Sequence, residues 1–126
     1  MRFALLMAIP LFVSACRPLS PEEQTKRRYE RYHAELVAYS HTEKYRLSSD
    51  LGGYRGIPSY DAIVALGPPA VPSIAETLRA NKDPVAILDI LADAIIEIKK
   101  WNREEFHGET RGRSRLEVLE RLDATQ

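Results

Sequence analysis

The side chains best suited to metal or nucleophilic chemistry are few and far apart in this chain. His33, His41 and His107 are its three histidines, and no two of them have the His-x-x-x-His spacing that places two ligands on one helix face. Cys16 is the single cysteine, and no Gly-x-Ser-x-Gly nucleophile motif is present. The sequence therefore predicts no catalytic residue, no metal site and no cofactor, which is typical of a protein that is not an enzyme.

Three carboxylates, Asp89, Asp93 and Glu97, recur every four residues and share one face of a predicted helix. A cation on this stripe would need converging oxygen ligands from a loop, which one helix does not supply, and Lys99 and Lys100 follow directly. We interpret the stripe as a polar, solvated face. Glycoside hydrolysis needs two carboxylates about 5–10 Å apart in a cleft, a distance that the sequence alone leaves open.

The one cysteine follows a segment with the features of an export signal. Arg2 precedes an apolar run over residues 3–13, which is too short for a settled transmembrane helix. Val13-Ser14-Ala15-Cys16 resembles the bacterial lipobox, which implies cleavage before Cys16 and acylation of its sulfur. The alternative is an ordinary signal or transmembrane segment with an incidental cysteine.

An acylated Cys16 would tether the chain to a bilayer, because two or three acyl chains exceed what stable anchoring requires. Residues 1–15 would be the signal peptide and residues 16–20 the tether. In enterobacterial lipoproteins, which this segment resembles, an aspartate directly after the cysteine favours retention in the inner membrane. This chain has Arg17 at that position. We therefore expect the periplasmic face of the outer membrane if the host has two membranes.

Two groups of basic residues stand out. The first is Lys26, Arg27, Arg28 and Arg31, which would contact lipid headgroups near the anchor or belong to a solvated face paired with neighbouring glutamates. We favour the solvated face.

The second basic group is a candidate interaction surface in the charged segment that ends the chain. It consists of Arg103, Arg111, Arg113 and Arg115. Removal of residues 1–15 leaves 17 Lys+Arg against 18 Asp+Glu, so bulk charge does not indicate nucleic-acid binding, and the predicted compartment argues against it.

The chain is organised around three predicted helices between residues 60 and 101. Ser59 is predicted to cap the first helix, 60–66, and Gly67 to end it, since glycine takes positive φ readily. Pro69 is predicted in the first turn of a second helix that runs to about residue 79. Asp83 is predicted to cap the third helix, with Pro84 at its first position.

Apolar spacing predicts which faces of these helices point inward. The second helix buries Val71, Ile74, Ala75 and Leu78. The third carries two neighbouring stripes, which makes it the most buried helix: Leu88, Leu91, Ile95 and Ile98, and Ile87, Ala94 and Trp101.

Helices are also predicted before and after this centre. Ser20, Pro21 and Glu23 form a capping box for a helix to about residue 40, whose aromatic stripe is expected to pack in the core. That stripe is Tyr29, Tyr32, Leu36 and Tyr39. A loop follows over 41–58. Ser114 is predicted to cap a final helix with Leu116, Leu119 and Leu122 inward.

The segment IVALGPPAVPSI, residues 63–74, resembles the helix junction of HEAT-like repeats of the phycobilisome-lyase type, and Asp83-Pro84 resembles the start of a next repeat. The resemblance covers about a third of the chain and implies a helical surface that binds protein. A solenoid needs about three repeats to bury a continuous core. The resemblance therefore predicts a single HEAT-like module and not a solenoid.

These observations predict one all-α domain over residues 21–126 with about five helices. The expected function is that of a membrane-anchored envelope lipoprotein acting as a non-catalytic protein-interaction module. Its partners would be the bilayer, through Cys16, and another envelope protein. The alternative is a small envelope factor that binds or hydrolyses peptidoglycan or another anionic glycan.

Overall fold

The computed structural model describes residues 18–42, 57–106 and 113–125, and all regular structure in these ranges is helical. The prediction of a small all-α domain is therefore confirmed. The elements are α2 (Pro21–Tyr39), α4 (Pro58–Leu66), the 3₁₀ turn η1 (Pro68–Ala70), α5 (Val71–Ala80), α6 (Val85–Lys99), the 3₁₀ turn η2 (Arg103–Glu105) and α7 (Arg113–Ala124). Cys16 and most of the predicted loop 41–58 lie outside the described residues.

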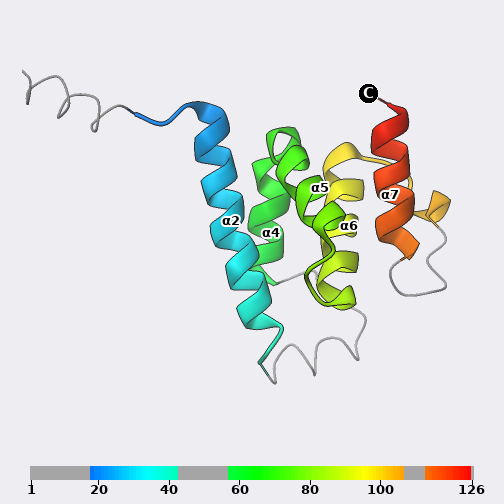
Figure 1. Ribbon diagram of the computed structural model, residues 1–126, viewed down its shortest axis with the longest axis horizontal. Helices are drawn as coiled ribbons and strands as arrows, with labels where there is room; N and C mark the ends of the chain where they lie inside the picture. The colour runs from blue at the N-terminus through cyan, green and yellow to red at the C-terminus, as the bar shows by residue number, and fades with distance from the viewer. Residues whose placement is uncertain (1–17, 43–56, 107–112, 126) are drawn as a thin grey trace, which may run out of the picture.

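The helices stand side by side, with α2 at one edge and α7 at the other (Figure 1). Helix α2 runs antiparallel to α4, which in turn runs antiparallel to α5 (Figure 1). Helix α6 packs against α4, α5 and α7, while α2 packs against α4, η1 and α5. Within the described residues, no helix combines the length and apolar composition needed to cross a bilayer.

Helix α6 forms the centre of the core, as its two apolar stripes predict. Its buried side chains are Ile87, Leu88, Ile90, Leu91, Ala92, Ala94, Ile95 and Ile96. Ile98 and Trp101, at the end of the predicted stripes, are only partly buried. Three neighbouring helices are required to cover α6, because its buried residues occupy most of its circumference. The predicted inward face of α5 is confirmed in full, since Val71, Ile74, Ala75 and Leu78 are its buried residues.

The junction between α4 and α5 differs from its prediction in detail. Gly67 has φ 74° and ψ −164°, so the positive φ is confirmed although the residue is not left-handed helical. Pro69 lies in η1, and α5 begins only at Val71. The predicted cap Ser59 is wrong: Pro58 takes the first helical position, so Ser59 falls inside the first turn and its side chain is buried.

The ends of the outer helices are a mixed result. Ser20 caps α2, since its hydroxyl accepts a bond from the Glu23 backbone N–H at 3.2 Å. Helix α7 begins at Arg113, so Ser114 lies inside the helix instead of capping it. The predicted leucine stripe of α7 is also shifted, because α7 packs on α6 and α5 from one side only. Val118 and Leu122 are buried there, whereas Leu116 is 55% exposed.

We predict that Leu91→Ala lowers the free energy of unfolding by about 2–5 kcal/mol, because it removes a fully buried side chain from α6 and leaves a cavity. Leu116→Ala is the matched control, and its exposed side chain should change stability by about 0.5 kcal/mol or less. Denaturant unfolding of both variants provides the measurement. Equal destabilisation by the two changes would mean that the core is not centred on α6.

Candidate functional site

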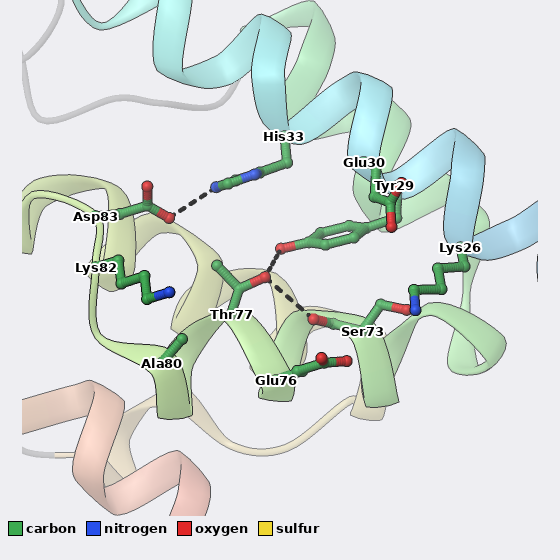
Figure 2. Close-up of a pocket in the computed structure, with 10 residues that line it drawn as sticks. All are labelled: Lys26, Tyr29, Glu30, His33, Ser73, Glu76, Thr77, Ala80, Lys82 and Asp83. Atoms are coloured by element: carbon green, nitrogen blue, oxygen red, sulfur yellow. Dashed lines mark hydrogen bonds and ion pairs between the residues drawn. The ribbon is translucent and has the colours of Figure 1, made fainter.

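A groove of about 380 Å³ lies between α2 and α5 and is lined largely by polar side chains. Figure 2 shows side chains of both helices, and of the turn before α6, pointing into it. Its lining consists of Lys26, Tyr29, Glu30, His33, Ser73, Glu76, Thr77, Ala80, Lys82 and Asp83. The volume is within the range of small-molecule sites, so the chemistry of these groups decides what the groove can do.

A chain of hydroxyl bonds crosses the groove from α2 to α5. The Tyr29 hydroxyl lies 2.7 Å from Thr77 Oγ1, and Thr77 Oγ1 donates to the backbone carbonyl of Ser73 at 3.1 Å (Figure 2). Because the single hydroxyl proton of Thr77 is used in that bond, the Tyr29 O–H donates to Thr77. The predicted packing role of Tyr29 is confirmed by its burial, and its hydroxyl adds a polar contact between the helices.

Burial is the main cause that raises the pKa of Tyr29 to about 12. The negative charges of Asp83 and Glu76 raise this pKa further, whereas the hydrogen bond with Thr77 lowers it. The phenol is therefore neutral at physiological pH and unsuited to act as a general base.

Next to this hydroxyl chain, His33 binds Asp83. Nε2 of His33 lies 2.7 Å from Oδ2 of Asp83, and the two side chains are 24% and 19% exposed (Figure 2). Since a carboxylate only accepts, Nε2 carries the proton of this bond. The predicted capping role of Asp83 is thus wrong: α6 begins at Val85 with no side-chain cap, and the carboxylate joins α2 instead. The His33 ring also stacks on Tyr29, with centroids 5.8 Å apart.

The groove has the properties of a clamp between α2 and α5. A His–Asp pair assists catalysis when the second imidazole nitrogen activates a nucleophile, but the hydroxyls of Tyr29 and Thr77 are already bonded to each other and to the backbone. The charged side chains at its rim are exposed and of both signs, Lys26 and Lys82 with Glu30 and Glu76. They give no single-signed field that would select an ionic ligand.

The acidic stripe of α6 lies partly under cover. Asp93 is 20% exposed and 3.6 Å from the Arg103 guanidinium, while the buried Tyr60 donates its hydroxyl proton to Glu97 at 2.6 Å. Burial raises the pKa of Asp93 above its usual 3.8, Arg103 lowers it and Glu97 raises it further. Within the described residues, no three His, Cys, Asp or Glu side chains lie close enough to hold a metal ion.

The predicted basic surface is described only in part. Arg103, in η2, is beside Asp93, and Arg115, in α7, donates to the Leu78 carbonyl at 3.4 Å. Arg111 and the side chain of Arg113 lie outside the described residues. The structure thus places two of the four arginines on separate internal contacts, and whether the four act together stays a prediction.

Sequence reasoning missed a cation–aromatic cluster that joins η2 to α7. Trp101 and Phe106 stack with centroids 5.7 Å apart, and the Arg121 guanidinium lies 5.2 and 4.5 Å from the two rings. Arg121 also pairs with Glu105 at 2.7 Å. Two aromatic residues in an otherwise charged segment were the available signal, but nothing local indicated the arginine of a later helix.

No protein-family model, curated protein or solved structure matches this chain. The HEAT-like resemblance of residues 63–74 therefore stays a prediction.

We predict that Tyr29→Phe lowers the free energy of unfolding by about 0.5–1.5 kcal/mol, since Thr77 keeps its bond to Ser73 and no donor is orphaned. The folded-state pKa of about 12 exceeds the unfolded value of 10.0, so this group's contribution to stability is complete below pH 10.0 and lost as pH rises toward 12. Phenolate absorbance should lose one late-titrating tyrosine in the variant. If the absorbance change at high pH is the same in the variant, the late-titrating tyrosine is a residue other than Tyr29. Tyr32→Phe is the control for the loss of one ring hydroxyl.

We predict that Asp93→Asn raises the melting temperature at neutral pH. The folded-state pKa of Asp93 is raised, so the stability linked to its proton is complete below the unfolded value of 3.8 and lost as pH rises through the folded value. The gain should disappear at pH values below 3.8. Asp123→Asn, at an exposed carboxylate paired with Arg79, is the charge-matched control. A lower melting temperature for Asp93→Asn at neutral pH would mean that the contact with Arg103 outweighs desolvation.

Proposed function

We propose that this protein is a lipid-anchored component of a bacterial cell envelope whose helical domain binds another envelope protein without catalysing a reaction. The observation that carries the proposal is the sequence Val13-Ser14-Ala15-Cys16 after an apolar run, with Cys16 as the only cysteine of the chain. An anchor of this kind restricts the domain to the membrane surface, where a binding module is useful because its effective concentration toward a membrane partner is high.

The groove between α2 and α5 supports binding over catalysis. The hydroxyls of Tyr29 and Thr77 are bonded to each other and His33 is bonded to Asp83, so these four side chains hold α2 against α5 and the following turn. The raised pKa of Tyr29 supports the same interpretation. What the domain offers to a partner is its outer surface, held in place by the packing around α6.

The basic surface of Arg103, Arg111, Arg113 and Arg115 is the part of the proposal that selects a partner. The Arg103 side chain is half exposed, and Arg115 donates to the Leu78 carbonyl at 3.4 Å. A carboxylate is the group that a guanidinium binds in a short, bidentate geometry. The partner face would therefore be acidic.

One observation favours a second candidate, binding or hydrolysis of peptidoglycan or another anionic glycan. A partly buried carboxyl with a raised pKa beside a second carboxylate is the arrangement that a general acid requires, and Asp93 beside Glu97 has it. Against it, Glu97 accepts the Tyr60 proton and Asp93 faces Arg103, so both carboxylates have internal roles.

The anchor is tested by Cys16→Ala. Wild-type protein should incorporate a labelled fatty acid and remain with the membrane fraction, whereas the variant should take up no label and become soluble or remain as the uncleaved precursor. An unlabelled wild-type protein, or a labelled variant, would contradict the anchor.

The partner is tested by crosslinking in cells that express the lipidated protein. One envelope protein should be captured in near-stoichiometric yield, and the four-fold Arg→Gln variant at the basic surface should lose it. A variant that removes three positive charges outside this set of arginines, Lys82→Gln, Lys99→Gln and Lys100→Gln, should retain it. Capture of wall fragments alone, with release of muropeptides that depends on Asp93, would favour the second candidate instead.

A further inference from the structure

Three consecutive basic side chains, Lys26, Arg27 and Arg28, are exposed on α2, and we call them the basic turn. None of the ion pairs among the described residues involves any of the three. Arg31, one turn further, is also exposed, but its guanidinium donates to the Tyr32 hydroxyl at 3.2 Å and lies over the Tyr32 ring. The basic turn therefore presents positive charge that nothing in the described part of the domain neutralises by direct contact.

The glutamates of α2 do not pair with the basic turn, as a solvated, ion-paired face would require. Glu22 and Glu23 lie in the first helical turn, where the positive end of the helix dipole accounts for them. Glu30 and Lys26, one helical turn apart, both line the groove toward α5, so Arg27 and Arg28 are the members of the basic turn that lie outside it. No ion pair among the described residues supports the ion-paired interpretation for these two arginines.

The basic turn is close to Cys16 along the chain, whatever conformation the intervening residues adopt. Helix α2 starts at Pro21, five residues after Cys16, and an extended chain covers at most about 3.6 Å per residue, or about 18 Å in total. Arg28 is seven residues into the helix, about 10 Å further at 1.5 Å per residue. A lipid at Cys16 thus keeps the basic turn within about 30 Å of the bilayer surface and lets α2 lie along it.

The orientation of α2 in the domain allows such contact. Its inward face carries Tyr29 and Leu36, both buried, and Arg27 is about 160° from that direction at 100° per residue. Helix α2 forms one edge of the domain, and the other helices all lie on its opposite side (Figure 1). A flat surface therefore reaches the outward face of α2 without meeting α4, α5, α6 or α7.

We propose that the outward face of α2, through the basic turn, binds the anionic headgroups of the membrane in which the protein is anchored. The inference rests on the proposed lipid anchor and adds the orientation of the domain to it. With α2 on the bilayer, α7 lies at the edge of the domain farthest from the membrane, facing the compartment in which a partner is met (Figure 1). Bulk charge does not drive this contact, since residues 16–126 hold 17 Lys+Arg against 18 Asp+Glu.

The test uses the chain that begins at Cys16, coupled at its one thiol to a single myristoyl chain. One such chain binds membranes only with a constant on the order of 10⁴ M⁻¹, so added electrostatic affinity remains measurable. Binding is measured to phosphatidylcholine vesicles with and without phosphatidylglycerol, at low and at physiological salt. Because the lipid is attached chemically, the result does not depend on whether cells acylate Cys16.

We expect a preference for the anionic vesicles of about tenfold to hundredfold at low salt, weakening as salt screens the charges. Lys26→Gln, Arg27→Gln, Arg28→Gln should abolish most of this preference. The charge-matched variant Lys82→Gln, Lys99→Gln, Lys100→Gln should keep it. Melting curves of both variants establish that exposed substitutions leave the fold intact.

Three results would overturn the proposal: no preference in the wild type, a preference that survives loss of the basic turn, or equal loss in the charge-matched variant. Sedimentation with isolated wall sacculi that depends on the basic turn, without a vesicle preference, would assign the surface to a wall polymer instead. Labelling of Cys16 in cells decides the anchor separately, so failure of the surface and failure of the anchor are distinguished.

Discussion

The burial of α6 is the constraint on which the rest of the structure depends. Eight of its residues are buried and occupy most of its circumference, so the helix is stable only when neighbours cover it. Helices α4, α5 and α7 provide that cover. The sharp turns at Gly67 and Asn81, both with positive φ, let α4, α5 and α6 follow one another closely enough to do so. The elements outside this centre are then placed by what they attach to it.

Helix α2 is attached differently on its two faces. Toward the core it contributes the buried Tyr29 and Leu36, and polar contacts from α2 to Thr77 and Asp83 fix its position against α5 and the following turn. Away from the core it exposes the basic turn, along with glutamates of the same helix. Because α2 is packed on the core and is the helix nearest to the predicted lipid anchor, contact of α2 with the membrane would fix the orientation of the whole domain. This arrangement links the fold to the proposed function.

The sequence predicts the local features of this fold well. The burial of α5 and α6 follows from apolar residues at helical spacing, and the start of α2 follows from Ser20 and Pro21, because both signals lie within one or two turns of chain. The predicted starts of α4 and α7 are each two residues too late, because the predicted caps Ser59 and Ser114 both lie inside the first turn.

The contacts that sequence reasoning missed are those between distant residues. His33 and Asp83 are fifty residues apart, and local rules assigned Asp83 to the start of α6, where a cap is its commonest role. The packing of α2 against α5 brings the imidazole within reach and changes the partner. Arg121 over Trp101 and Phe106 is a second case. Such contacts depend on how helices pack, which periodicity within one helix does not specify.

The most direct measurement of this account is native-state hydrogen exchange of the intact domain in increasing denaturant. If α6 is the centre of the core, its amides exchange only through global unfolding, at a free energy equal to the stability of the domain. The amides of α2 and α7, which lie at the edges, should exchange through smaller openings. Exchange of α6 at a lower free energy than α2 or α7 would contradict the account, because the helix on which all others are placed would then not be the most stable element.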